Sequence, residues 1–255
     1  MRKGLFTVVF MVSITVVFIS VLAFVNEISR DRIAKNQEIR RIRSIMYACN
    51  IFPGNIHETD LSPGSTTTDI PWDVEQLLDM VNARMKVVHL PIPPSQKRHL
   101  QNSFLSLQDS VQIFLIRNVN DEIDGYGFNL RGKGLWGTIA AFAVVSSDFT
   151  RMIGIDFTEQ VETPGLGARI TESEFKYLFR GLNLKGFFER QGNQTVIDMV
   201  SKKEKTNLEE STNTIQAITG ATQTCNGVLN MLNTDLWFYI SLLRENQEWL
   251  KKSHF

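Results

Sequence analysis

The sequence has little of what disulfide scaffolds, zinc sites and nucleic-acid surfaces are built from. Its two cysteines, Cys49 and Cys225, are far apart and stand in no Cys-x-x-Cys or Cys/His spacing. This excludes a disulfide framework and argues against a structural zinc site, so we expect both to be small buried apolar groups. Lys and Arg together number 27, as do Asp and Glu, so the chain lacks the basic excess that captures nucleic acid.

The spacing of the polar residues also lacks the usual catalytic and nucleotide-binding patterns. No Ser/His/Asp set or close pair of carboxylates is visible, and the glycines match neither a GxGxxG fingerprint nor a Walker loop. The histidines form no HxxxH pair; they are His57, His89, His99 and His254. We therefore predict no catalytic residue, no metal site and no classical nucleotide-binding fold.

What the chain does have is a long apolar run near its N-terminus. From Leu5 to Val25 there are 21 residues without a charge. As a helix they would span roughly 31 Å, close to the hydrocarbon thickness of a bilayer. The run exceeds the apolar core of a signal peptide, and Ala23-Phe24-Val25 is a poor cleavage site. We predict an uncleaved transmembrane anchor at residues 1–26, with Ser and Thr hydroxyls bonded back to the helix. The flanking charges leave its orientation open.

Residues 27–110 divide into a helix and a region of unknown role. Isoleucines on a charged background predict a juxtamembrane helix over 27–51. It is either a stalk or partner-binding helix, or a continuation of the anchor into solvent. Residues 52–110 are predicted to be a linker followed by a helical region. Asp69-Ile70-Pro71-Trp72 would start that helix, with apolar residues at helical spacing up to Met85.

The chain changes character beyond residue 110. Short apolar or alternating runs, separated by Gly, Asn and Asp, predict antiparallel strands joined by tight turns. These strands are expected at 111–117, 123–130, 135–146 and 151–160, with two more at 194–201 and 214–219.

Two helices are predicted in the same part of the chain. One covers 171–180, with Thr171 as its N-cap and Glu174 completing a capping box. The other runs from about 222 to 251, and its apolar face consists of Val228, Leu232, Leu236, Ile240 and Leu243. Helices segregated from strands make residues 111–255 an α+β domain, an antiparallel sheet with flanking helices.

The start of the last helix carries the most informative chemistry. A strand, a Gly-Ala pair and hydroxyl residues lead into a helix N-terminus, where free N–H groups and the helix dipole favour a phosphate. Gly220 and Ala221 would let a phosphate or a ring approach the backbone. The hydroxyls are those of Thr219, Thr222 and Thr224. The alternative is an ordinary helix cap made by Thr222.

Two glycine-rich segments precede this helix. They read Gly-Lys-Gly-Leu-Trp-Gly at 132–137 and Glu-Thr-Pro-Gly-Leu-Gly at 162–167. Taken alone, each is a turn between strands.

With all three segments in this order behind one N-terminal span, the chain resembles a family of FMN-binding subunits. The family comprises the C subunit of the sodium-translocating NADH:quinone oxidoreductase and the G subunit of the Rnf electron transport complex. The resemblance is strong over about residues 125–232 and at the N-terminus, and weak over 52–110. The family motif, Asp-x-x-Ser/Thr-Gly-Ala-Thr, implies that Thr222 takes FMN through a phosphoester bond. Gln216 stands where the motif has aspartate, which puts the rate or the covalency of attachment in question.

The resemblance also implies roles for the surrounding residues. Those expected along the phosphate and the ribityl chain are Thr219, Gly220, Ala221 and Thr224. Trp136 and Leu166 are expected to pack on the isoalloxazine, because such side chains offer a large contact area. Glu162 and Thr163 are expected to hydrogen-bond its polar edge.

The implied function is electron relay through covalently bound FMN in an ion-translocating NADH:quinone oxidoreductase, as its C-type subunit, without independent substrate chemistry. FMN would do the redox work, and the domain would lie on the extracytoplasmic side of the inner membrane. Expected partners are the other membrane subunits of the complex and a magnesium-dependent flavin transferase. An electron carrier of the Rnf type is the first alternative, consistent with Gly167-Ala168-Arg169-Ile170. A flavin-free, membrane-tethered binding or assembly protein is the second, and Gln216 keeps it open.

Overall fold

A computed structural model provides the fold, which divides into two compact units, Met1–Arg41 and Ile42–Phe255. The residues that the structure describes are 2–51, 74–97, 100, 103–190, 194–201 and 213–246. The predicted helix start at residues 69–72 lies outside them. The domain boundaries expected at 26, 51 and 110 stay predictions.

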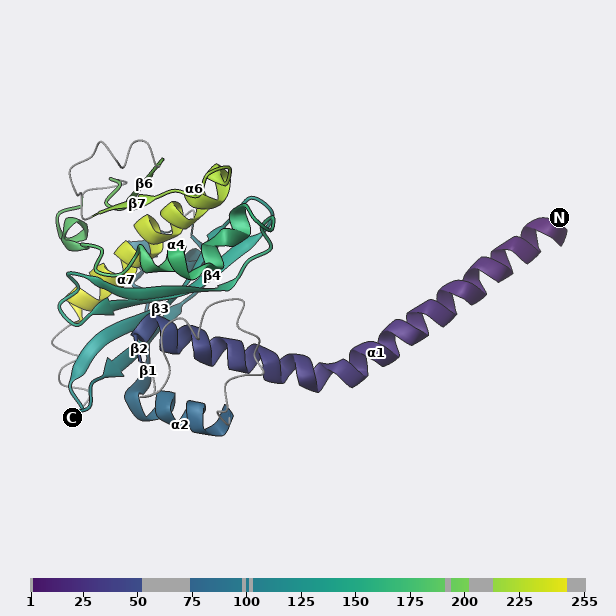
Figure 1. The fold of residues 1–255 in the computed structure, drawn as a ribbon, viewed down its shortest axis with the longest axis horizontal. Helices are drawn as coiled ribbons and strands as arrows, with labels where there is room; N and C mark the ends of the chain where they lie inside the picture. Colours follow the sequence, from purple (N-terminus) through teal and green to yellow (C-terminus); the bar gives the residue numbers. More distant parts are fainter. Residues whose placement is uncertain are drawn as a thin grey trace. The chain divides into compact units, whose positions relative to one another are not determined.

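The first unit belongs to one helix, α1 (Arg2–Cys49), drawn in purple in Figure 1. Within the described residues it is the one helix long and apolar enough to cross a membrane. Its hydroxyls bond back to the helix as predicted, with Ser13 Oγ donating to the Val9 carbonyl at 2.9 Å and Ser20 Oγ to that of Val16 at 2.8 Å. The helix continues through residues 27–47, which confirms the predicted helix there and is compatible with either role expected for it.

The second unit is built on a five-stranded antiparallel sheet in the order β1-β2-β3-β4-β5. The strands are β1 (Met85–Pro91), β2 (Ser110–Arg117), β3 (Ile123–Lys133), β4 (Thr138–Ser146) and β5 (Met152–Glu159). Four of them confirm the predicted strands. β1 was not predicted. It follows directly on α2 (Val74–Arg84) and pairs with β2 from Met85↔Ile116 to Pro91↔Ser110.

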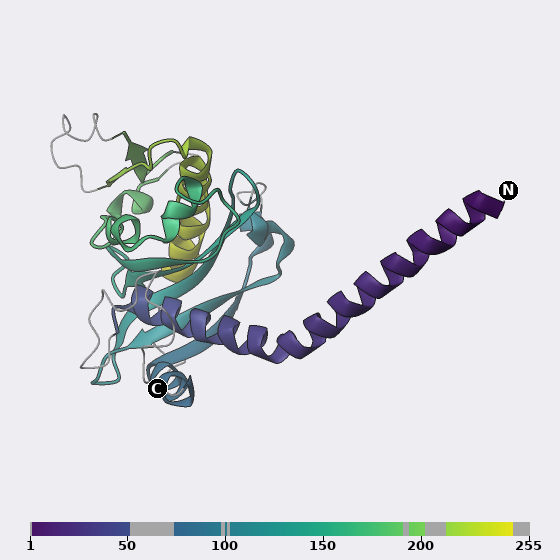
Figure 2. The ribbon, with the colours of Figure 1, turned by 45° about the vertical axis from the view of Figure 1, so that its right-hand side comes forward.

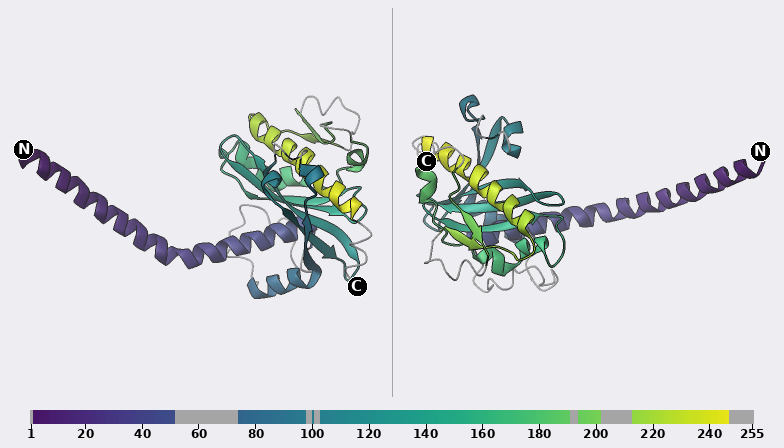
Figure 3. Two further views of the ribbon diagram at one scale, coloured as in Figure 1. Left: turned by 180° about the vertical axis from the view of Figure 1, so that it is seen from behind. Right: turned by 90° about the horizontal axis from the view of Figure 1, so that it is seen from above.

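Both faces of the sheet are covered, which explains why β4 is a continuous apolar run. On one face lies the C-terminal helix, formed by α6 (Thr222–Met231), the π-helical turn η6 (Leu232–Leu236) and α7 (Trp237–Glu245) (Figures 1 and 3). Its predicted apolar face is buried throughout. The C-terminal end of α1 lies on the other face (Figure 2). There its residues 42–49 form one apolar cluster with Phe114 and Ile116 of β2 and Phe142 and Val144 of β4.

The predicted helix at 171–180 is wrong in extent and in its cap. The chain forms a 3-10 turn, η4 (Gly167–Thr171), and then a short helix, α4 (Ser173–Tyr177). The Thr171 hydroxyl donates to the Ala168 carbonyl at 2.9 Å, inside the preceding turn, so it is not placed to cap a helix. Glu172 is the N-cap residue of α4, and no side chain among the described residues caps that helix.

The two remaining predicted strands form a separate parallel pair, β6 (Asp198–Val200) and β7 (Thr214–Gln216). The buried Asn233 of η6 joins this part to the C-terminal helix. Its Oδ1 accepts from the Val196 and Ile197 N–H groups at 2.8 and 3.0 Å, and its Nδ2 donates to the carbonyls of Ile197 and Leu229. The other short elements are α3 (Pro94–Lys97), η3 (Phe104–Leu107) and η5 (Lys185–Phe188).

Candidate functional site

The turn between β7 and α6 presents an exposed hydroxyl at an open helix end. The chain reverses at Gly220, whose φ of 80° lies in the left-handed region that glycine tolerates best. α6 then begins at Thr222, and its N-cap residue is Ala221, without a side-chain cap. The interpretation of Thr222 as an ordinary helix cap is therefore wrong. Thr219, Gly220 and Thr222 are exposed at the positive end of the helix dipole.

Glu162 joins both glycine-rich segments to this helix. Its side chain is 5% exposed. Oε2 accepts from the Thr224 hydroxyl at 2.5 Å, and Oε1 accepts from the Trp136 backbone N–H at 3.0 Å. The backbone N–H groups of Leu135 and Gly137 lie near enough to help lower the pKa of this carboxyl.

The hydrogen bonds at Glu162 decide its charge. Burial raises the pKa of this carboxyl, but the Thr224 hydroxyl and the three backbone N–H groups outweigh burial and hold its pKa below the ordinary value. The carboxylate is therefore ionised at neutral pH, behind the first turn of α6.

An exposed apolar rim surrounds the buried carboxylate. Trp136 is 68% exposed and Leu166 is 43% exposed, although both are large apolar side chains. The Trp136 indole Nε1 donates to Thr163 Oγ1 at 3.1 Å. A Cβ at Gly220 would lie 3.1 Å from Leu166 Cδ2, so the rim reaches the turn that precedes Thr222. Leu135 and Val161 are exposed beside it.

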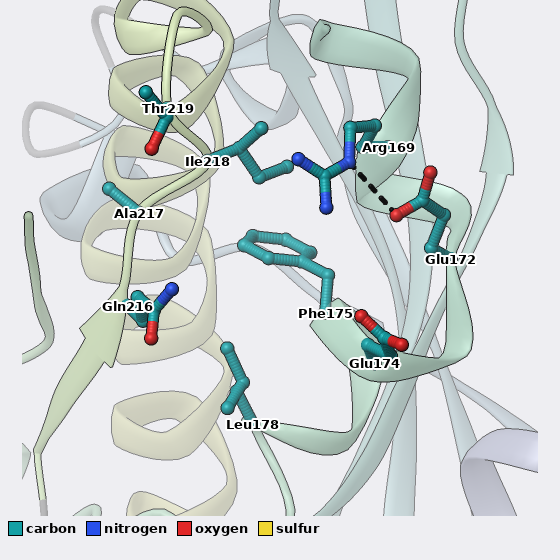
Figure 4. A pocket seen from close by; sticks show the side chains of 9 residues that line it. All are labelled: Arg169, Glu172, Glu174, Phe175, Leu178, Gln216, Ala217, Ile218 and Thr219. Carbon is teal, nitrogen blue, oxygen red and sulfur yellow. Dashed lines mark hydrogen bonds and ion pairs between the residues drawn. The ribbon is translucent and has the colours of Figure 1, made fainter. Parts of the chain in front are cut away.

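A cavity of about 270 Å³ lies behind the same turn. Its walls are Arg169, Glu172, Glu174, Phe175, Leu178, Gln216, Ala217, Ile218 and Thr219. Figure 4 shows Gln216 on one wall and Glu174 on the other, with the Phe175 ring between them. Arg169 Nε donates to Glu172 Oε2 at 3.0 Å. Gln216, the departure from the family motif, therefore lines this cavity at the end of β7.

The structure brings the predicted site residues together from three separate segments. Trp136, Glu162, Thr163, Leu166 and Thr224 form one contact network, and Thr219 to Thr222 lie at its edge. Their contacts with a cofactor stay predictions. Sequence reasoning assigned Glu162 and Thr224 to the ligand, and it did not foresee that they bond to each other.

Two further groups were not foreseen. The backbone N–H groups of 135–137 carry no signal in a sequence, because any residue except proline supplies one. Asn233 did leave a signal, as a polar residue beside Leu232 on an apolar helix face. Among the described residues no three His, Cys, Asp or Glu side chains are grouped to hold a metal ion. Both cysteines are buried and free, as predicted.

Comparison with known proteins gives one family over this region. Residues 134–236 match the FMN-binding domain family. The C subunit of the Na(+)-translocating NADH-quinone reductase of Chlamydia pneumoniae is 35% identical over 127 residues, 46% of this chain and 39% of that protein. Its counterpart from Pasteurella multocida is 31% identical over 144 residues, 52% of each. The chain thus spans about half the length, or less, of these curated relatives.

Two crystal structures share the fold. NqrC of Shewanella oneidensis has a TM-score of 0.56 at 17% identity, covering 82% of this chain and 98% of that one. The C subunit of the Na(+)-translocating NADH-quinone reductase from Parabacteroides distasonis has a TM-score of 0.56 at 21% identity, covering 83% and 96%. The resemblance to FMN-binding subunits and the α+β fold with an N-terminal apolar helix are confirmed.

Proposed function

We propose that this chain is a membrane-anchored flavoprotein subunit that carries FMN on Thr222 and relays electrons within a sodium-translocating NADH:quinone oxidoreductase. The observation that carries the proposal is the open start of α6. It presents an exposed hydroxyl and an uncapped helix end next to an exposed apolar rim. The family match over residues 134–236 includes all of these parts.

The helix end fits the phosphate of FMN. The N–H groups of its first turn have no intrahelical acceptor, and the dipole favours a negative group there. Thr222 is exposed, so an attaching enzyme can reach its hydroxyl. The buried Ala221 and the left-handed Gly220 keep side chains away from the approach. Thr219 lies exposed on the same turn and would hydrogen-bond the phosphate or the ribityl chain.

The apolar rim fits the isoalloxazine. Trp136 and Leu166 expose large apolar surfaces to water, which a flat aromatic ring would cover with gain of free energy. Thr163 fixes the Trp136 ring from one side through the indole N–H. When bound, FMN supplies the one- and two-electron chemistry, and the protein holds, orients and shields it.

The proposed role as a subunit of the reductase also implies a membrane anchor and partner proteins. α1 is long and apolar enough to span a bilayer, and we assign it as the anchor of an inner-membrane subunit. The domain then lies on the extracytoplasmic side, where covalent attachment prevents loss of the cofactor. Other membrane subunits of the reductase supply and accept the electrons, and a magnesium-dependent flavin transferase attaches the FMN. The relatives from Chlamydia pneumoniae and Pasteurella multocida belong to the sodium-translocating reductase, which favours this complex over Rnf.

The test is co-expression of the full chain with such a transferase, followed by a denaturing gel viewed under ultraviolet light. We expect fluorescence at the 29.1 kDa band and a peptide containing Thr222 heavier by one FMN less water. Thr222→Val should abolish both signals, whereas Thr222→Ser, which keeps a hydroxyl, should retain them. Thr158→Val, at an exposed threonine of β5 outside the site, is the matched control and should still fluoresce.

The alternatives give different results in the same experiment. Flavin that co-purifies but leaves the chain on denaturation would mean FMN bound without the phosphoester. A colourless chain would leave the flavin-free tethered protein. Gln216→Asp restores the negative charge of the motif aspartate beside the turn. It should therefore speed the attachment.

A further inference from the structure

We infer that Glu162 is a positioning residue of this site, which fastens the Trp136 loop to α6 and sets a fixed negative charge behind the flavin seat without touching the flavin. The inference rests on the proposed function, and it differs from the role at the polar edge of the ring that the resemblance implied. It follows from where the two carboxylate oxygens point.

The hydrogen-bonding capacity of Glu162 is used inside the protein. Both carboxylate oxygens are engaged, because Oε2 accepts from the Thr224 hydroxyl and Oε1 accepts from the Trp136 backbone N–H. The backbone N–H groups of Leu135 and Gly137 add to the stabilisation of the charged form. With 5% of the residue exposed, the carboxylate has little surface to offer a flavin N–H. These bonds therefore serve the protein's own geometry.

These bonds join three segments that are distant in the sequence. Residues 135–137 connect β3 to β4, Glu162 follows β5, and Thr224 lies in the first turn of α6. The loop lies directly on the carboxylate, because a Cβ at Gly134 would be 2.5 Å from Glu162 Oε1. The side chain thus sets how far the Trp136 loop stands from the helix end that bears Thr222.

The charge has a consequence for the redox chemistry. A buried negative charge near the flavin seat disfavours the arrival of an electron, since charges interact strongly where water is excluded. Glu162 should therefore lower the midpoint potential of the attached flavin. No contact with the ring is needed for this effect.

Two conservative variants of Glu162 distinguish its positioning role from the effect of its charge. Glu162→Asp keeps the charge but is one methylene shorter, so it should lose its reach to the loop. Amide hydrogen exchange at 135–137 should then become at least about tenfold faster, with the midpoint potential near that of the wild type. Glu162→Gln keeps the length and loses the charge, so its midpoint potential should move to a more positive value with a smaller change in exchange.

The controls use neighbouring residues. Thr224→Val removes one donor and should accelerate exchange at 135–137, while Thr224→Ser should restore it. Glu159→Gln removes an exposed carboxylate paired with Arg131 at 3.5 Å, and should change neither readout. Should Glu162→Gln fail to fold, Glu162→Asp and the two Thr224 variants still report on the tether.

All measurements use the full chain in detergent, with exchange recorded before flavin loading and potentials after it. Unchanged exchange at 135–137 in Glu162→Asp and Thr224→Val would overturn the positioning role. A midpoint potential in Glu162→Gln equal to that of the wild type would overturn the role of the charge. Absence of flavin on the wild-type chain would refute the proposed function instead, and the exchange data would still decide the tether.

Discussion

Two buried carboxyls, one bonded to the start of the C-terminal helix and one within it, have pKa values shifted in opposite directions. Glu162 bonds to the first turn of α6, and its pKa is lowered. Asp235 lies in η6 and is 1% exposed. Burial raises the pKa of Asp235 to about 7, which its bonds from the Ser103 hydroxyl and the Arg131 backbone N–H reduce only in part. Its Oδ2 has no hydrogen-bond partner among the described residues.

The difference follows from the balance between burial and hydrogen bonding at each carboxyl. At Glu162 the donors outweigh burial and lower the pKa, whereas at Asp235 burial is the largest cause and raises the pKa. Tyr239, buried one helical turn further, has its pKa raised by burial and also by Asp235. Variants at either carboxylate, or at a donor to it, test this contrast.

The largest effect is expected when the well-satisfied carboxylate is removed. Glu162→Ala leaves buried N–H groups and the Thr224 hydroxyl without an acceptor, so it should lower the free energy of unfolding by about 3 kcal/mol. Denaturant unfolding of the full chain in detergent at neutral pH measures this. Glu159→Ala, at an exposed carboxylate, should change it by less than about 0.5 kcal/mol. A larger loss in Asp235→Ala than in Glu162→Ala would reverse the contrast.

Asp235→Asn should stabilise the protein at high pH. A raised folded pKa means that the stability is present at low pH and is lost as pH rises toward the folded value of about 7. Above pH 7 the neutral amide should therefore gain on the order of 1 to 3 kcal/mol, and near pH 4 it should gain nothing. Unfolding midpoints between pH 4 and 9 provide the check. The same pH slope in both proteins would show that Asp235 does not titrate in the folded state.

Thr224→Val should have the smallest effect and act in the acid range. The lowered folded pKa of Glu162 gives stability that is present above its unfolded pKa and is lost as pH falls through the folded pKa. Removing the hydroxyl raises the folded pKa, so the acid loss should begin at higher pH. At neutral pH the variant should lose about 1 kcal/mol. Acid unfolding curves for the Val and Ser variants test this, and coinciding curves would contradict it.

The sequence predicted the central strands because their faces are both buried. The run Ile139–Val145 is buried at every position and bounded by turn residues, which leaves little ambiguity. β1 escaped prediction for the opposite reason. It is an edge strand with only Leu90 buried, and Lys86 and His89 interrupt any alternation. With one buried position, β1 has no alternation of apolar and polar residues from which a strand could be predicted.

The candidate site was predictable in part. The hydroxyls and the Gly-Ala pair before α6 are local features, and the structure places them at a helix start as expected. The direction of the Glu162 side chain depends on three segments that meet only in the fold, and no local pattern contains it. The π-helical turn around Asn233 and Asp235 is likewise set by contacts with β3 and residues 196–197.

The hydrogen bonds of Asn233 fix the rotation of the helix that begins at Thr222. The Asn233 side chain bonds to the backbone N–H groups of Val196 and Ile197 and to the Leu229 carbonyl. These bonds restrain sliding and rotation of the helix between Thr222 and Asn233. Each residue of an α-helix advances the side chain by roughly 100°. Deleting one residue from 223–229 would therefore swing the Thr222 hydroxyl away from the rim. The length of this short stretch is therefore as much a part of the candidate site as its chemistry.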